Sequence, residues 1–517
     1  MSGRSRAPRW QRGLAFAVGA FIIVGSPPLW AGILLASLAS GAILAGPLVA
    51  ARRRRRPTVA AQPPGDVTVL GTSYEGEPVW VSDRQLGAHT VIVGASGSGK
   101  STTLLTILAE QVRRGKGLVA IDMKGSPAFA ATLEHAAARA GRPFYLWTPD
   151  GPSAWNPLAY GNPTELKDKL ISMERFSEIH YQRAAERYLQ VVLQVLRITH
   201  AGGPPPTLSD VVELMDPARL QGQLRALSPL IAHRVQRYLT DELTPDQLSA
   251  VRGLGTRLAI ITESHTGQYL GGPAFEFDPE GAFPPARAAL DLRAALRGDQ
   301  VVVFSLNSSS YAKLAAQLGA LVLRDVITVV GELTTHPEQR HPAMVALDEF
   351  SGLNGDQIVD LQQRCREAEV GFAVTSQEPT DFERAARGLL DQILGNTAVK
   401  ISHRLDVPKS AELVADLAGT ETVWEETHQF ERHPFFGTRA TGRSTARQVE
   451  RFVIHPNVIK SLPTGHAVVI TKVPETRAQL ARITPPPSPQ NGAATSRELN
   501  FPGQLQAGGS AAALAPR

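Results

Sequence analysis

Short apolar runs bounded by turn residues recur along much of the chain. Such runs, without polar alternation, are typical of strands that are buried on both faces of a parallel sheet. Segments with helical spacing separate them. The predicted core strands are His89 to Gly94, Gly117 to Asp122, Val301 to Leu306, Ala343 to Asp348, Gly371 to Ser376, Ala398 to Ser402 and Ala467 to Thr471. This alternation predicts an α/β core with a mostly parallel sheet. Val67 to Leu70 and Pro78 to Val81 predict two further short strands before it.

The pattern changes between about Tyr160 and Arg297. Tyr181 to Thr199 and Thr244 to Ser264 have helical spacing, and strand-like runs are few. We therefore predict an all-α domain at residues 159–297, inserted into a core formed by residues 67–158 and 298–484. Residues 485–517 are rich in proline, alanine and glycine, which predicts a disordered tail.

The chain begins with a long segment that suits a membrane. No charged residue occurs from Leu14 to Ala51, and Pro27 and Pro28 interrupt this stretch near its middle. Because a span needs about 20 apolar residues, the segment predicts a hairpin of two transmembrane helices, about 14–30 and 31–51, within a membrane anchor of residues 1–56. Arginines flank both ends, so the positive-inside rule places both ends in the cytoplasm. A single span or a re-entrant segment is the alternative. Residues 57–66 predict a linker.

The distribution of charge changes the meaning of the formal net charge of +5. Residues 1–56 contain nine arginines and no acidic residue, so the rest of the chain carries about −4. The basic balance is therefore a feature of the membrane flank. It says little about DNA, and a basic channel within an acidic domain remains an alternative. The single cysteine, Cys365, excludes an intramolecular disulfide and suits the cytoplasm. The histidines show no metal-ligand spacing, and we predict no structural transition metal.

A phosphate-binding motif follows the first core strand. Its residues are Gly94, Ala95, Ser96, Gly97, Ser98, Gly99, Lys100 and Ser101, and they fit GxxxxGK[ST] between an apolar strand and a helical segment that starts at Thr102. The N–H groups of such a loop cradle phosphates. We expect Lys100 to hold the β- and γ-phosphates and Ser101 to ligate Mg²⁺, which predicts ATP and Mg²⁺ as cofactors.

Polar residues end two later strands. Asp348 and Glu349 follow the strand at Ala343, and we expect Asp348 to hold Mg²⁺ and Glu349 to act as general base toward the attacking water. Gln377 ends the next strand and is a candidate sensor of the γ-phosphate. The alternative is that its side chain only caps the end of the strand. These residue types complete a hydrolytic site of the phosphate-loop kind.

Two charged pairs leave alternatives open. Arg364 and Arg366 lie on a predicted helix, where either is a candidate arginine finger for a neighbouring subunit or a solvated side chain. Asp122 and Lys124 follow the second core strand, near where a nucleotide binds at the carboxyl ends of strands, or form a charged turn.

These motifs, in this order, resemble the TraD/TraG-like coupling-protein ATPases of conjugative type IV secretion, which are related to hexameric DNA translocases. The likeness covers about Gly87 to Lys472. It is carried by Gly94 to Ser101, Asp122 to Gly125, Leu347 to Phe350, Thr375 to Gln377 and Gly395 to Thr397. Met123 departs from the pattern, because relatives usually have proline there. The resemblance implies a RecA-like P-loop NTPase core, the all-α insertion and the membrane hairpin.

The resemblance also implies a function. A homo-hexameric ring at the bacterial inner membrane, mostly cytoplasmic, would receive a relaxase-bound single strand of DNA and drive it into the type IV secretion channel with ATP. Its insertion domain would contact the relaxosome or cargo. Two alternatives remain: a cargo receptor whose nucleotide site regulates docking without sustained turnover, and a motor for duplex DNA in chromosome segregation or for protein secretion.

Overall fold

The computed structural model describes residues 65–173, 176, 178–271, 289–350, 353, 355–433 and 437–487. The described residues belong to one compact unit. The predicted transmembrane hairpin, most of the linker and the tail beyond residue 487 lie outside the described residues.

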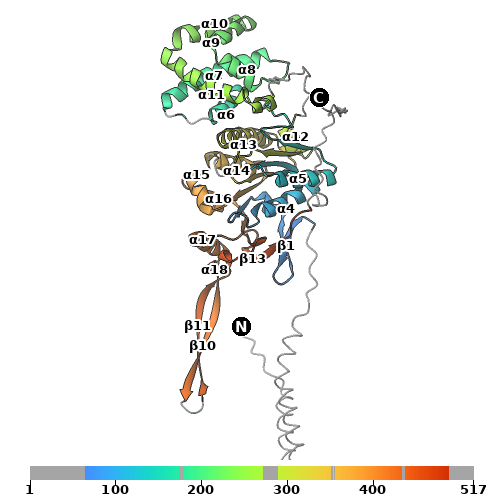
Figure 1. Cartoon of the computed structure of the whole chain (residues 1–517), viewed down its shortest axis with the longest axis vertical. Helices are drawn as coiled ribbons and strands as arrows, with labels where there is room; N and C mark the ends of the chain where they lie inside the picture. Colours follow the sequence, from blue (N-terminus) through green and yellow to red (C-terminus); the bar gives the residue numbers. More distant parts are fainter. Residues whose placement is uncertain are drawn as a thin grey trace, which may run out of the picture. The chain divides into compact units, whose positions relative to one another are not determined.

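The described chain is built on a sheet of eleven strands (Figure 1). In spatial order they are β2 (Pro78–Ser82), β1 (Val67–Ser73), β13 (Arg477–Ile483), β12 (His466–Thr471), β9 (Val399–Ser402), β3 (Thr90–Val93), β8 (Gly371–Ser376), β7 (Ala343–Asp348), β4 (Gly117–Asp122), β6 (Val301–Ser305) and β5 (Phe144–Trp147). Strands β9 to β5 pair in parallel, and β2, β1, β13 and β12 extend the sheet with antiparallel pairs. The prediction of an α/β fold with a mostly parallel sheet is therefore confirmed.

Helices cover both faces of this sheet. On one face α4 (Lys100–Arg113) and α5 (Pro127–Arg139) pack on alternate strand residues such as Leu118 and Ala120. On the other face the helices are α13 (Ala312–Thr335), α14 (Gly355–Glu367), α16 (Leu389–Asn396) and α17 (Pro408–Ala418), in one core cluster with the intervening strand residues such as Val119 and Ile121. The parallel strands are buried on both faces, which is why their sequences are continuously apolar. Shorter helices are α3 (Asp83–Gly87), α12 (Leu292–Arg297), α15 (Pro379–Ala385) and α18 (Pro456–Lys460).

A group of helices connects β5 to α12. It contains α6 (Pro163–Ile171), α7 (Ile179–Thr199), α8 (Leu208–Leu214), α9 (Pro217–Gly222), α10 (Pro229–Arg237) and α11 (Pro245–Thr262), and it lies at the upper end of Figure 1. No strand occurs among the described residues from 163 to 271. Proline at the first turn and capping boxes start several of these helices, as at Thr244 before α11.

A buried ion pair joins this group of helices to the long core helix α13. The Lys169 ammonium on α6 lies 2.6 Å from an Asp325 carboxylate oxygen on α13, and the two side chains are 1% and 0% exposed. The Trp155 indole N–H donates to the other carboxylate oxygen at 2.8 Å. The ammonium also donates to the carbonyl oxygens of Pro157 and Tyr160. The pair therefore fixes α6 and the segment that leads into it against the long core helix α13.

Four strands of the structure are not predicted by the hydrophobic pattern. β5 is a short strand at one edge of the sheet, and β13 pairs antiparallel with β1 and β12. β10 (Thr420–His433) and β11 (Gly437–Phe452) form a separate two-stranded hairpin. Trp424 on β10 is 65% exposed, and polar residues surround it in sequence, so no apolar alternation marks this strand.

One described helix, α13, is long and apolar enough to cross a membrane. Most of its apolar residues are buried, and they pack in the core on the face of the sheet that α14 also covers.

Candidate functional site

The phosphate loop leaves the carboxyl end of β3 and closes onto α4. Gly94 has φ +155°, and a Cβ there would lie 2.6 Å from His403 Cβ and 2.8 Å from Ser98 Oγ. Gly99, with φ +114°, ends the loop directly before α4. A larger residue at Gly94 would displace the loop, so this glycine is required by both backbone angle and space.

Lys100, the first residue of α4, points back into the loop. Its side chain is only 5% exposed, and its ammonium donates to the carbonyl oxygens of Gly94 at 2.6 Å and Ala95 at 3.2 Å. Burial lowers the pKa of Lys100. Among the described residues the hydrogen-bond partners of this ammonium are carbonyl oxygens and it has no direct ion pair, so an anionic phosphate at the loop would give it a charged partner.

Asp348 joins the loop to the end of β7. Ser101 Oγ donates to one carboxylate oxygen at 2.8 Å, and Thr375 Oγ1 donates to the other at 2.6 Å. Burial raises the pKa of Asp348, against the hydrogen bonds from Thr375 and Ser101. A hydroxyl and a carboxylate are oxygen ligands of the kind that Mg²⁺ prefers, so Ser101 and Asp348 fit a Mg²⁺ site.

Glu349 and Gln377 lie next to this pair at the same sheet edge. Glu349 has φ +53°, a left-handed conformation that is strained for a residue with a side chain. Its backbone N–H donates to Thr375 Oγ1 at 2.9 Å, and the Gln377 amide donates to its carboxylate at 3.1 Å. Thr375 therefore holds both acidic residues. In the sequence Thr375 is marked only by its place in the Thr-Ser-Gln motif at the end of β8.

The turn after β4 meets the same edge. Asp122 pairs with Asp348 in the sheet register, and its buried carboxylate accepts the backbone N–H groups of Lys124 and Gly125. Burial raises the pKa of Asp122 to about 6. Met123 donates its N–H to the Asp348 carbonyl oxygen at 3.2 Å. A proline has no N–H to donate, so methionine adds one backbone hydrogen bond at this position.

His403, at the end of β9, is a residue of the loop's floor that the sequence did not reveal. Its Nε2 lies 2.8 Å from Thr103 Oγ1 on α4, and the ring is fully buried. Burial lowers the pKa of His403 to about 4, so the ring is neutral at physiological pH. The next segment of the floor is Gly465, whose N–H donates to the Ser98 carbonyl oxygen at 2.9 Å.

Arg364 and Arg366 lie elsewhere. Both are exposed near the C-terminal end of α14, which leads toward the amino end of β8 and so toward the sheet edge opposite the phosphate loop. Arg364 lies 3.4 Å from Glu367. The structure therefore does not bring either arginine to the phosphate loop of its own chain.

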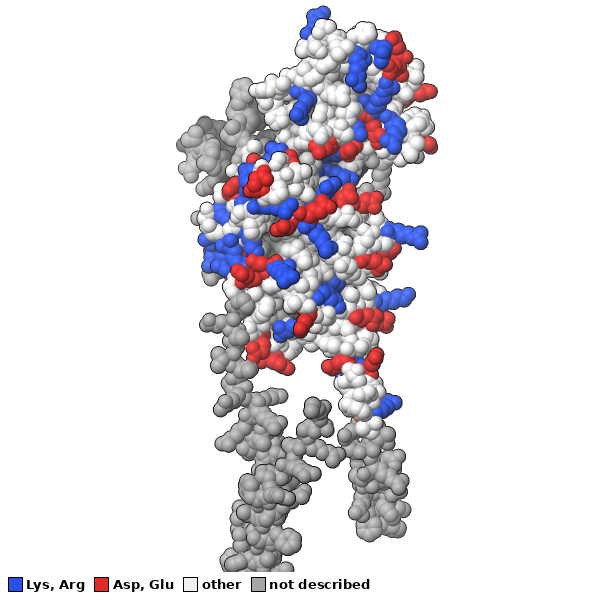
Figure 2. All heavy atoms as spheres, turned by 180° about the vertical axis from the view of Figure 1, so that it is seen from behind, with Lys and Arg blue, Asp and Glu red and all other residues white. Residues whose placement is uncertain are grey.

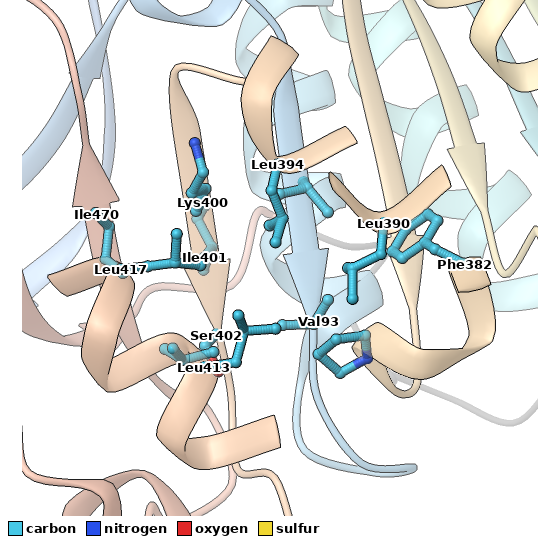
Figure 3. Close-up of a pocket in the computed structure, with 13 residues that line it drawn as sticks. Val93, Phe382, Leu390, Leu394, Lys400, Ile401, Ser402, Leu413, Leu417 and Ile470 are labelled. Atoms are coloured by element: carbon cyan, nitrogen blue, oxygen red, sulfur yellow. The ribbon is translucent and has the colours of Figure 1, made fainter. Parts of the chain in front are cut away.

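A small apolar pocket lies between the strands β9 and β3 and the helices α16 and α17, apart from these polar residues (Figure 3). Leu390 and Leu394 of α16 face Leu413 and Leu417 of α17 across it. Lys400 extends along its wall, and its ammonium donates to the Thr397 carbonyl oxygen. Burial lowers the pKa of Lys400 to about 8. This pocket contains none of the predicted site residues.

Two family models match parts of the chain. Residues 342–464 match a family model described as the TraM recognition site of TraD and TraG, and residues 49–126 match that of the FtsK/SpoIIIE family. The sequence has no significant match among curated proteins.

Solved structures share the fold. The unbound bacterial conjugative coupling protein TrwBdeltaN70 aligns with a TM-score of 0.56 at 13% identity, over 85% of this chain and 92% of that one. TrwB with the GTP analogue GDPNP aligns with a TM-score of 0.53 at 14% identity, over 82% and 91%. VirB4 of Thermoanaerobacter pseudethanolicus gives 0.53 at 16% identity, over 82% and 98%. At these identities the likeness shows the fold.

The parallel sheet, the phosphate loop and the acidic strand end define a P-loop ATPase core. Within that class, the two family models and the shared fold confirm the resemblance predicted from the motifs: the chain is similar to the TraD/TraG-like coupling ATPases.

Proposed function

We propose that the protein is an ATP-hydrolysing coupling protein, anchored in the bacterial inner membrane, that links a relaxase–DNA substrate to a type IV secretion channel and drives DNA transfer. The observation that carries the proposal is the convergence of Lys100, Ser101, Asp348 and Glu349 at one sheet edge, in a chain whose remaining motifs match coupling proteins.

The side chains divide the chemistry among them. The loop from Gly94 to Thr102 cradles the phosphates with its N–H groups. Lys100 turns from the carbonyl oxygens of Gly94 and Ala95 to the β- and γ-phosphates. Ser101 and Asp348 would hold Mg²⁺, and the bound ion would supply positive charge to the phosphate oxygens. Glu349 accepts a proton from the attacking water, and Thr375 fixes the backbone that aims its carboxylate.

Gln377 connects the base to the nucleotide. Its amide holds the Glu349 carboxylate at 3.1 Å, and a terminal phosphate within reach would compete for the same N–H group. Glu349 would then be released toward water when ATP is bound. Arg364 or Arg366, exposed on the other sheet edge, would complete the site of the next subunit in a hexameric ring.

The DNA would be held mainly by a ring channel. Figure 2 shows basic and acidic side chains interspersed over the visible face, in keeping with the net charge of about −4 outside the first 56 residues. A charged channel that follows the phosphate backbone predicts binding that weakens steeply with salt and has little sequence preference.

The test is the ATPase rate of the full-length protein in detergent, with and without single- or double-stranded DNA, and with Glu349→Gln as the blank. Stimulation by single strands supports the conjugative motor. Stimulation by duplex alone would favour a duplex pump, and an assembled ring that no DNA stimulates would favour a cargo receptor. Lys100→Ala should weaken nucleotide binding itself; unchanged affinity would remove the phosphate-loop assignment.

A further inference from the structure

The turn at Lys124 is fixed by a buried carboxylate. Asp122 is fully buried, and its carboxylate accepts the backbone N–H groups of Lys124 at 2.9 Å, Gly125 at 3.1 Å and Ser126 at 2.5 Å. On the other side, a Cβ at Gly125 would lie 2.6 Å from Asn307 Cα, so the turn packs directly on the segment after β6. The Lys124 backbone is thus held in place while its side chain is exposed.

This turn lies on the side of the site where a terminal phosphate belongs. The strand order runs β3, β8, β7, β4, so Gln377, Glu349 and Lys124 leave the sheet in succession from the strand beside the phosphate loop outward. The proposed base and sensor must face the terminal phosphate to act on it. Lys124 leaves the strand next to that of Glu349, whereas the loop that holds the inner phosphates follows β3.

The charge at the turn is unbalanced. Among the described residues the Lys124 ammonium has neither a hydrogen bond nor an ion pair. The exposed ammonium extends from a fixed turn at the carboxyl end of β4, the strand that pairs with the one carrying Asp348 and leading into Glu349. An ammonium in this place can bind an anionic phosphate through charge-assisted hydrogen bonds.

We propose that Lys124 is a second cationic ligand of the nucleotide, which contacts the terminal phosphate of ATP, and that Asp122 is the residue that positions it. The inference rests on the proposed ATPase function and adds to it a means of distinguishing ATP from ADP. The contact is made only when the terminal phosphate is present, so it contributes to the affinity for ATP and not to that for ADP.

The experiment titrates the full-length protein in detergent, with Mg²⁺, against ADP and against the non-hydrolysable ATP analogue with a β,γ-imido bridge. Lys124→Ala should lower the affinity for the analogue about tenfold, the contribution of one charge-assisted hydrogen bond, and change the affinity for ADP less than about twofold by the same reasoning. Lys124→Arg should retain most of the preference. Lys313→Ala removes an exposed lysine from the start of α13 and serves as the matched control, with no change in either affinity.

Asp122→Asn gives an independent measurement. An amide nitrogen in place of one carboxylate oxygen does not accept an N–H group, so the turn loosens and the analogue-to-ADP preference should fall while Lys124 itself is intact. Equal losses for both nucleotides in Lys124→Ala, or an unchanged preference, would overturn the proposal. So would a loss of DNA affinity alone, which would make Lys124 a nucleic-acid contact.

The two levels of inference fail differently. If Lys100→Ala weakens both nucleotides and Lys124→Ala leaves the preference intact, only the role of Lys124 is wrong. If Lys100→Ala weakens neither, the nucleotide site itself is misassigned.

Discussion

The buried pair of Lys169 and Asp325 makes a quantitative prediction for the attachment of the helices α6 to α11. Lys169→Met keeps the length of the side chain but removes its charge. The Asp325 carboxylate then keeps the Trp155 N–H as its described partner, and the carbonyl oxygens of Pro157 and Tyr160 lose a donor. Removing one partner of a buried ion pair costs roughly 3–5 kcal/mol. Burial already raises the pKa of Asp325, so protonation of the carboxyl offsets part of this cost, which favours the lower end of the range.

Hydrogen exchange in the full-length protein measures this directly, because local opening is reported segment by segment. Each 1.36 kcal/mol corresponds to about a tenfold change, so amides of α6 and of residues 155–160 should exchange roughly 10²-fold faster or more. Arg183→Met is the matched control, since its pair with Glu186 is at the surface, where such pairs contribute about 0.2–1 kcal/mol. Unchanged exchange in Lys169→Met would refute the reasoning. A double variant Lys169→Met/Asp325→Leu that exchanges as fast as the single one would also refute it, because the penalty should come from the unpaired carboxylate.

Three further predictions concern the nucleotide site. Thr375→Val should lower kcat about 10²-fold or more with a smaller effect on nucleotide affinity, because Asp348 loses a donor and Glu349 loses the acceptor of its N–H group; Thr375→Ser should retain most of the rate, and steady-state kinetics would show it. Glu349→Gln should bind ATP with turnover reduced about 10²- to 10⁴-fold in a coupled ATPase assay; near-normal turnover would exclude Glu349 as the base. His403 titrates with a pKa lowered from 6.5 to about 4, so the unfolded chain binds the proton more readily, and stability is present above pH 6.5 and is lost as the pH falls toward 4. His403→Phe should flatten thermal stability between these pH values, and a residual slope is expected from His89, whose pKa is also lowered to about 4; an unchanged slope would contradict the assignment.

The parallel core could be predicted from sequence because burial on both faces leaves a local trace. Gly117–Asp122, Ala343–Asp348 and Gly371–Ser376 form strands with the predicted bounds. The hairpin of β10 and β11 leaves no such trace, since its described ends expose polar residues and Trp424. Its register depends on pairing between the two strands, which hydrophobic periodicity does not report.

The residues of the candidate site also differ in whether the local sequence predicts them. Lys100 and Asp348 stand directly next to apolar strands or a glycine-rich loop, and their positions were evident from local sequence. His403 reaches the loop only because β9 pairs in parallel with β3, a contact between residues about 300 positions apart. The arginines were ambiguous in sequence, and they stay so in one subunit, since Arg364 and Arg366 face away from their own phosphate loop.

The position of β8 between β3 and β7 explains why one strand serves both acidic residues. Neighbouring strands lie about 4.8 Å apart, so the end of β7 is about 10 Å from the end of β3, and the end of β8 lies between them. The loop crosses this gap through Ser101, whose hydroxyl reaches Asp348. Thr375 and Gln377, at the end of β8, therefore lie between the phosphate loop and the two acidic residues. Thr375 donates to the Asp348 carboxylate, which is proposed to hold the metal ion. Gln377 donates to the carboxylate of Glu349, the proposed base. On the proposed mechanism, a strand in this position therefore registers the terminal phosphate and transmits its presence to Glu349 without any movement of the sheet.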